Sequence, residues 1–299
     1  MTPDAAAAGE LSLADLSVAR LGYGAAKLTG PGIWGPPANV AGSISLLRRA
    51  AELGVNLIDT ADSYGPFVSE DLIRRALFPY RDVFIATKGG CLRTGPDQWS
   101  NLARPDYLRQ SCEMSLRRLG VGAIDLYQLH EVDPLVPFED QLGALVELQR
   151  EGKIRHIGLS SVRPDQLELA LSLARIVSVQ GLYNVLDRSS EAVLRYCEAC
   201  EIAFIPFFPL GDGHLAASGG PLADLAVAAG CTPAQLAIAW LLHRSRVVLP
   251  IPGTASTAEL EENVAATGVE LSESTVRQLD SLAANGGLLT PSKSSGYGI

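Results

Sequence analysis

The sequence predicts one α/β domain, residues 1–299, built as a closed parallel (β/α)8 barrel of the TIM-barrel type with a short N-terminal hairpin cap. Two observations favour this fold class. Helix-period and strand-period segments alternate from residue 20 to about residue 266 with no linker-like break between them. The alternation gives eight strands, each followed by a helix. Right-handed crossovers place such helices outside the sheet, and an open doubly wound sheet more often has fewer strands.

The first ten residues are small and polar, so we expect a flexible tail there. Residues 11–18 alternate between apolar and polar side chains, which predicts a hairpin or cap rather than core. Strands are expected over residues 20–25, 55–59, 82–88, 123–129, 154–160, 176–180, 202–207 and 246–250. Helices are expected over residues 40–54, 69–77, 105–119, 139–151, 164–173, 190–200, 221–229, 233–243 and 257–266. A second flexible tail is expected from about residue 286 to residue 299.

The composition excludes several classes of partner. A formal net charge of −9 with no basic stripe argues against nucleic acid and against an anionic membrane surface. No apolar run reaches the length of a membrane span, and the N-terminus lacks the features of a signal peptide. We therefore expect a cytoplasmic protein, a monomer or weak homo-oligomer, that acts on a small molecule.

The five cysteines are scattered, as reduced thiols in a cytoplasm are. Cys197 and Cys200 have the CxxC spacing, but they lie inside a helical pattern with no second pair. The sequence thus predicts no metal site.

Three successive strands end in an ionisable residue. Asp59 ends the first of them and is followed five residues later by Tyr64, while Lys88 and His130 end the next two. An aspartate at a strand end often only caps the next turn, and a tyrosine beside glycine is common in loops. In a barrel, however, the carboxyl ends of the strands share one rim, where the chemistry of this fold takes place.

If these four groups converge, they can deliver a proton to a carbonyl oxygen. A tyrosine hydroxyl has a pKa of about 10, and a nearby ammonium such as that of Lys88 lowers it. Asp59 would keep Lys88 charged by ion pairing, and His130 could donate a hydrogen bond to the same oxygen. The constellation suits hydride addition with proton delivery, and it lacks only the hydride.

Motifs over nearly the whole chain, from Leu21 to about Ala266, resemble those of the aldo-keto reductases. They are Asp59-Thr-Ala-Asp-Ser-Tyr64-Gly, Ala86-Thr-Lys88, Asp125-Leu-Tyr-Gln-Leu-His130, Gly152-Lys-Ile-Arg-His-Ile-Gly-Leu-Ser160 and Ile251-Pro-Gly-Thr254 with Glu262-Asn263. The resemblance implies that Asp59, Tyr64, Lys88 and His130 form the catalytic tetrad, with Tyr64 as the general acid. It also implies reduction of an aldehyde or ketone by NADPH.

The same resemblance implies a cofactor site formed by Gly24, Thr60, Ser160, Ser161, Gln180, Phe207, Pro209, Leu210, Gly211, Gly253, Thr254, Ser256, Glu262 and Asn263. Ser161 stands where the family has Asn, and Phe207 stands where the aromatic that stacks on the nicotinamide is usually Tyr. Gly253 and Glu259 occupy positions that are often basic. A carboxylate there repels a 2′-phosphate, so NADH is an alternative to the NADPH that the family usually prefers.

For the substrate, we expect Trp34 and Trp99 to form walls of the pocket. The segments around Trp34 and Phe207 are similar to those of the bacterial branch that includes pyridoxal reductases, which hints at an aromatic aldehyde. Two other functions fit the fold: a cofactor-binding regulatory subunit with little turnover, and an isomerase or aldolase with Lys88 as a Schiff-base nucleophile. The complete tetrad argues against the first, and the pairing of Lys88 with Asp59 argues against the second.

Overall fold

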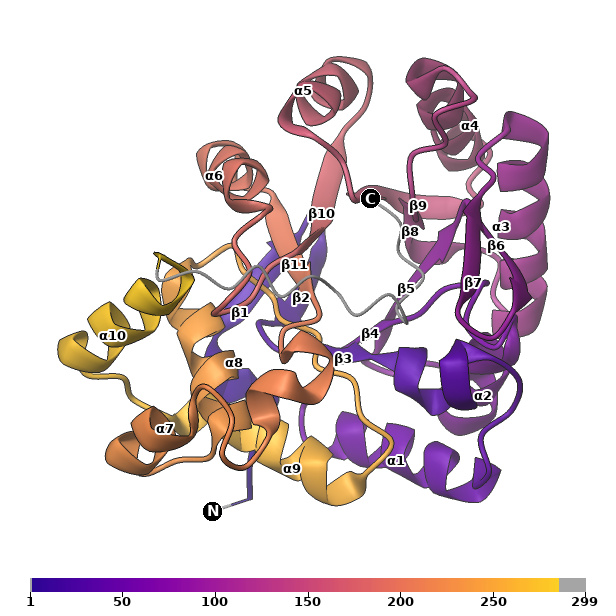
Figure 1. The fold of residues 1–299 in the computed structure, drawn as a ribbon. Helices are drawn as coiled ribbons and strands as arrows, with labels where there is room; N and C mark the ends of the chain where they lie inside the picture. Colours follow the sequence, from indigo (N-terminus) through magenta and orange to yellow (C-terminus); the bar gives the residue numbers. More distant parts are fainter. Residues whose placement is uncertain (1, 285–299) are drawn as a thin grey trace.

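A computed structural model describes residues 2–284. Its centre is a curled parallel sheet of seven strands in the order β11-β10-β9-β8-β5-β4-β3, with helices around the outside (Figure 1). The strands of this sheet are β3 (Tyr23–Gly24), β4 (Leu57–Asp59), β5 (Phe84–Gly89), β8 (Ile124–Leu129), β9 (Ile154–Ser160), β10 (Ile176–Leu182) and β11 (Ala203–Phe207). The expected strands at these seven places are therefore confirmed, although the first is only two residues long.

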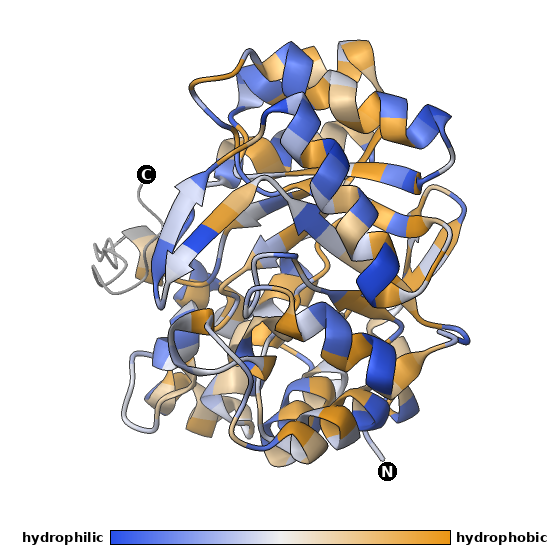
Figure 2. Cartoon of the chain, turned by 90° about the vertical axis from the view of Figure 1, so that its right-hand side faces the viewer, coloured by the Kyte–Doolittle hydropathy of each residue, from blue (hydrophilic) through white to orange (hydrophobic). Residues whose placement is uncertain are grey.

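The helices also follow the predicted order. They are α1 (Val40–Glu52), α2 (Val68–Leu77), α3 (Pro105–Leu119), α4 (Phe138–Arg150), α5 (Pro164–Leu173), α6 (Glu191–Cys200), α7 (Ala223–Ala229), α8 (Pro233–Arg244), α9 (Thr257–Ala265) and α10 (Glu273–Ala284). Figure 2 shows both polar and apolar residues on the outer helices, as expected for helices with one face on the sheet. Within residues 2–284 no single helix is long and apolar enough to span a membrane; α7 and α8, bent by 77°, reach that length only together.

The eighth strand, predicted over residues 246–250, is not regular. Only Val248 forms a bridge, to Phe204 of β11, while Gly22 donates to the carbonyl of Pro250 across 3.0 Å on the other side. Pro250 and Pro252 have no backbone N–H, so this segment cannot complete a ladder. It nevertheless lies between β11 and β3 and closes the barrel.

The N-terminal hairpin, β1 (Glu10–Leu13) and β2 (Leu16–Ala19), is confirmed, but its exclusion from the core is wrong. Leu13, Leu16 and Val18 are at most 2% exposed and pack with Leu57 and other side chains of the barrel interior. The polar residues between them explain why the alternating pattern predicted a cap outside the core. The hairpin is a plug whose inner face belongs to the core.

The expectation of a flexible tail over residues 1–10 is also wrong for the part that the structure describes. Asp4 caps a short 3-10 helix, η1 (Ala5–Ala8), in which Ala5 is fully buried and donates to the carbonyl of Leu53 across 2.8 Å. The second expected tail, from about residue 286, lies outside the described residues.

Several elements are absent from the sequence-based prediction. A second hairpin, β6 (Cys91–Gly95) and β7 (Gln98–Asn101), follows β5, and its Pro96-Asp97 turn is a signal that could have revealed it. Helix α10 packs through the buried Leu279, and its exposed polar residues weaken the helical pattern. Short 3-10 segments also occur in the loops: η2 (Ala25–Leu28), η3 (Pro31–Ile33), η4 (Gly211–Ala216) and η5 (Ala266–Gly268).

Candidate active site

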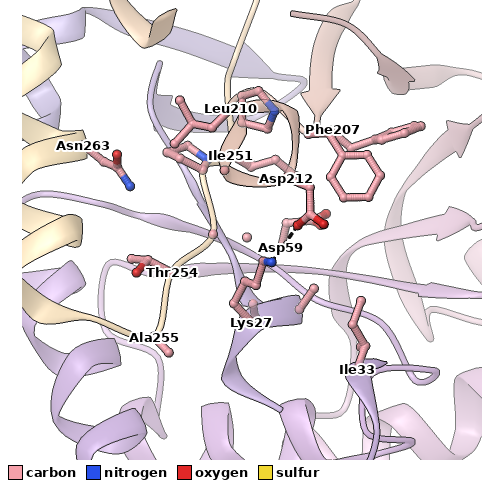
Figure 3. A pocket seen from close by; sticks show the side chains of 18 of the residues that line it. Lys27, Ile33, Asp59, Phe207, Leu210, Asp212, Ile251, Thr254, Ala255 and Asn263 are labelled. Atoms are coloured by element: carbon pink, nitrogen blue, oxygen red, sulfur yellow. Dashed lines mark hydrogen bonds and ion pairs between the residues drawn. The ribbon is translucent and has the colours of Figure 1, made fainter. Parts of the chain in front are cut away.

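The carboxyl ends of the parallel strands bring the predicted residues to one rim. Asp59 is the last residue of β4 and lies level with Ala86 of β5, two residues before Lys88. Beside the rim is a cavity of about 530 Å³, part of which is seen in Figure 3. The predicted residues that line it are Gly24, Asp59, Tyr64, His130, Ser160, Gln180, Phe207, Pro209, Leu210, Gly253, Thr254, Glu262 and Asn263.

A buried ion pair lies beside this cavity: Asp59 lines it, whereas Lys88, the remaining predicted catalytic residue, does not. The Lys88 Nζ lies 2.5 Å from Asp59 Oδ1, and both side chains are at most 2% exposed. The other Asp59 oxygen accepts from the amides of Gln128, at 3.0 Å, and Gln180, at 2.5 Å. Lys88 also donates to the carbonyl of Thr60 across 2.9 Å. Both buried charges are therefore paired and hydrogen-bonded, which offsets the cost of removing them from water.

Tyr64 lies above the ion pair. Its hydroxyl is 3.5 Å from Lys88 Nζ, and its ring is nearly perpendicular to that of His130, with centroids 5.9 Å apart. The expected net lowering of the Tyr64 pKa is not found in this structure. Burial, followed by the charge of Asp59, raises that pKa well above its usual value. The hydroxyl therefore stays protonated at neutral pH.

His130 follows β8 and is fixed by its backbone, which donates to the carbonyl of Gly89 across 2.9 Å. Its Nδ1 lies 3.3 Å from the Ser63 hydroxyl. Burial lowers the pKa of His130 well below its usual value, and the charges of Lys88 and Arg93 lower it further. The imidazole is therefore neutral.

The two tryptophans expected in the substrate pocket lie beside the cavity rather than in its lining. Trp99, on β7, packs edge-on against Tyr64 and His130, with centroid distances of 6.4 and 6.2 Å. Trp34 forms a backbone bridge with Gly65. Trp99 thus contacts two residues of the predicted tetrad. Trp34 contacts the loop after Tyr64 through Gly65.

Arg93 is a residue that sequence reasoning missed. Its guanidinium lies 3.6 Å from the Trp99 ring centroid and 5.8 Å from that of Trp34. It also donates to the carbonyls of Gly32, at 2.6 Å, and Ser63, at 3.1 Å. Because it lies on the unpredicted hairpin, only that hairpin's turn could have drawn attention to it.

Among the predicted cofactor residues, Thr60, Ser161, Gly211 and Ser256 do not line the cavity. The Ser161 hydroxyl donates to Glu131 across 2.9 Å, and Ser256 caps α9 by accepting from the backbone N–H of Glu259. Gly24 and Gly253 belong to the site for a steric reason. A Cβ on either would lie 2.7 Å from a backbone oxygen of the other segment, so the two strands can approach only as glycines.

The cavity is also lined by residues that were not among the predicted site residues: Ala25, Ala26, Lys27, Ile33, Glu131, Phe208, Asp212, Gly213, Ala216, Ala217, Ala234, Ile251, Pro252, Ala255 and Glu259. Lys27, in η2, pairs with Asp212, in η4, across 2.6 Å, and Figure 3 shows the pair reaching across the cavity. At the α9 end, the Thr254 hydroxyl donates to the Glu259 carboxylate. The lining therefore carries more acidic than basic groups.

Comparison with known proteins identifies the class. A model of the Aldo/keto reductase family matches residues 20–284. The chain therefore belongs to this family of oxidoreductases.

Two relatives make the similarity more specific. An uncharacterized oxidoreductase of Schizosaccharomyces pombe is 48% identical over 277 residues, which cover 93% of this chain and 90% of the relative. The pyridoxine 4-dehydrogenase of Escherichia coli is 43% identical over 279 residues, which cover 91% of this chain and 97% of the relative.

Solved structures agree with the fold. An aldo-keto reductase from Klebsiella pneumoniae in complex with NADPH has a TM-score of 0.75 at 28% identity, covering 89% of this chain and 92% of that one. The holo form of an aldo-keto reductase from Bacillus halodurans has a TM-score of 0.80 at 27% identity, covering 94% and 98%. The (β/α)8 barrel is confirmed, and structural relatives of the chain bind NADP(H).

Proposed function

We propose that this protein reduces the carbonyl group of a small aldehyde or ketone to an alcohol, with Tyr64 as the proton donor. The observation that carries the proposal is the line of contacts from Asp59 through Lys88 to the Tyr64 hydroxyl, at 2.5 and 3.5 Å, beside the cavity. The raised pKa of Tyr64 keeps its proton in place until the carbonyl oxygen becomes basic.

The remaining groups act on the same oxygen. The neutral His130, with Nδ1 facing the Ser63 hydroxyl, carries its proton on Nε2 when Ser63 donates, and it can then donate to the substrate. Lys88 stabilises the phenolate that forms as Tyr64 loses its proton, because the ammonium is already within 3.5 Å. A bound reduced nicotinamide supplies the hydride.

The cavity has a donor set that fits a nicotinamide dinucleotide. Ser160 is the last residue of β9, and Gln180 lies on β10 beside Asp59. The Phe207 ring offers a stacking surface, and Thr254 and Asn263 line the α9 end. NADPH is the proposed cofactor because a structural relative was solved with it. The carboxylate of Glu259 at the α9 end weakens contact with a 2′-phosphate, so NADH is expected to serve as well.

The substrate class is a heteroaromatic aldehyde of the pyridoxal type. Support comes from the pyridoxine 4-dehydrogenase relative, and from the aromatic Trp99 beside Tyr64. The test mixes purified protein, NADPH and pyridoxal and follows loss of the reduced cofactor together with formation of the alcohol. Stoichiometric formation of pyridoxine supports the proposal. Binding of NADPH without turnover of pyridoxal or of 4-nitrobenzaldehyde contradicts it and favours a regulatory subunit.

A further inference from the structure

A carboxylate without a cationic partner lies at the reacting end of the cavity. Glu131 follows His130 directly in the chain, and it lines the cavity together with His130 and Tyr64. Among residues 2–284, no lysine, arginine or histidine forms an ion pair with it. The nearby Lys88 is paired with Asp59.

Glu131 is held in place from one side only. The Ser161 hydroxyl donates to its Oε1 across 2.9 Å, and the Ser161 backbone donates to the carbonyl of Gln180 across 3.0 Å. Ser161 has a φ of 55°, a left-handed conformation that turns it back toward β8. Within the described part of the chain, Oε2 has no hydrogen-bond donor and remains for a ligand.

The Glu131 carboxylate lies close enough to Tyr64 and Cys91 to affect their pKa values. Glu131 is one of the charges that raise the pKa of Tyr64, and it contributes also to the raised pKa of Cys91 on β6. Its own burial raises its pKa to about 7. A partly buried, unpaired carboxylate is costly, and a cationic ligand group beside it removes part of that cost.

We propose that Glu131, positioned by Ser161, is a specificity-determining residue that favours aldehydes carrying a cationic group or a ring N–H and disfavours anionic ones. The inference rests on the proposed carbonyl reduction and adds a rule for substrate charge. It accounts for the one unpaired carboxylate that lies at the reacting end of the described cavity.

The experiment uses three benzaldehydes that differ in the charge of the para substituent: trimethylammonio, tert-butyl and carboxylate. The first two have nearly the same shape, so their comparison isolates charge. The value of kcat/KM with NADPH is measured for wild type and for Glu131→Gln. A matched control, Glu168→Gln, makes the same change of net charge on the exposed face of α5.

Removing the charge should lower kcat/KM for the cationic probe by about tenfold and raise it for the anionic probe by a similar factor. The tert-butyl probe should change by less than about threefold, and Glu168→Gln should match wild type for all three probes. The dissociation constant of NADPH, measured by quenching of tryptophan fluorescence, should not change.

An unchanged ratio of cationic to anionic probe in Glu131→Gln overturns the proposal. Equal losses for all three probes, or a weakened NADPH complex, also overturn it, because the residue then acts on the fold or the cofactor. If wild type reduces none of the probes, the proposed carbonyl reduction fails, whereas turnover without charge selection defeats only the role of Glu131.

Discussion

The Asp59 carboxylate accepts from Lys88, Gln128 and Gln180, and it thereby compensates the charge of a lysine that is only 1% exposed. This pair could be predicted, because three strand ends in sequence carry ionisable residues. The sequence did not predict that Gln128 and Gln180 donate to Asp59. Hydrogen bonds between non-adjacent strands depend on the closed barrel. Arg93 was missed because it lies on the β6–β7 hairpin, which was not predicted, and because its carbonyl partners come from separate loops.

Replacing Lys88 by Met tests the ion pair. The change leaves Asp59 buried without its cation, so the free energy of unfolding should fall by about 3–5 kcal/mol, and the rate of hydride transfer should fall at least about 10²-fold. Chemical denaturation and single-turnover kinetics measure the two effects. The double variant Asp59→Asn with Lys88→Met should regain stability but not activity; recovery of both would show that the pair is only structural.

Glu131 predicts a pH dependence of substrate choice. Its pKa is raised to about 7, so the carboxyl is charged above that pH and neutral below it. The preference for the trimethylammonio probe over the tert-butyl probe should therefore be full at about pH 8.5 and largely lost at about pH 5.5. Neither probe titrates, so the change reports the protein.

The groups that face Glu131 do not titrate in this range: the pKa values of Tyr64 and Cys91 are raised well above their usual values, and that of His130 is lowered. Asp62, whose pKa is also raised to about 7, is buried. Because Asp62 and Glu131 titrate in the same range, the Glu131→Gln variant is needed to distinguish their effects. A selectivity that still changes with pH in this variant would assign the effect to Asp62.

Glu259 tests the cofactor preference. Its carboxylate lines the cavity and accepts from Thr254, so replacing it by Arg reverses a charge at the α9 end and frees that hydroxyl. The ratio of NADPH to NADH affinity should rise by at least about tenfold. Dissociation constants for both dinucleotides at one ionic strength provide the measurement. An unchanged ratio would mean that the carboxylate does not face the 2′-phosphate.

At the scale of elements, boundaries follow local signals well where the pattern is strong. Strand β9 and helix α5 were predicted with their observed bounds, Ile154–Ser160 and Pro164–Leu173, because Ser160 and Pro164 mark the change of period. The eighth strand was predicted over residues 246–250 as a regular strand, but the segment is irregular. A hydrophobic pattern does not reveal that prolines interrupt the pairing. The β1–β2 hairpin was predicted to lie outside the core. One of its faces is buried because it covers an end of the barrel, and that burial depends on the assembled barrel.

We expect the packing of the β1–β2 plug to contribute to stability but not to turnover. Leu16→Ala should lower the free energy of unfolding by about 2–5 kcal/mol, because Leu16 is 2% exposed within the barrel interior. Leu135→Ala, at a residue that is 91% exposed, is the control and should have little effect. Turnover per folded molecule should equal wild type in both. A loss of turnover in folded Leu16→Ala would show that the plug also supports the site.

At the scale of the whole molecule, the two ends of the barrel have different tasks. The hairpin closes one end with apolar side chains, while the strands deliver Asp59, Lys88 and His130 to the other. The sequence allowed this division to be predicted because a parallel barrel places all carboxyl ends on one rim. It did not allow prediction of the pKa of Tyr64, since the burial and the Asp59 charge that raise it depend on three-dimensional packing.

The most direct measurement of the central claim is the single-turnover rate of hydride transfer from NADPH to 4-nitrobenzaldehyde in wild type and Tyr64→Phe. Loss of the hydroxyl alone should slow this step by about 10²–10⁴-fold, while the dissociation constant of NADPH stays nearly the same, because the ring still packs against Trp99 and His130. Retention of more than about a tenth of the wild-type rate, with hydride transfer limiting, would contradict the assignment of Tyr64 as the proton donor.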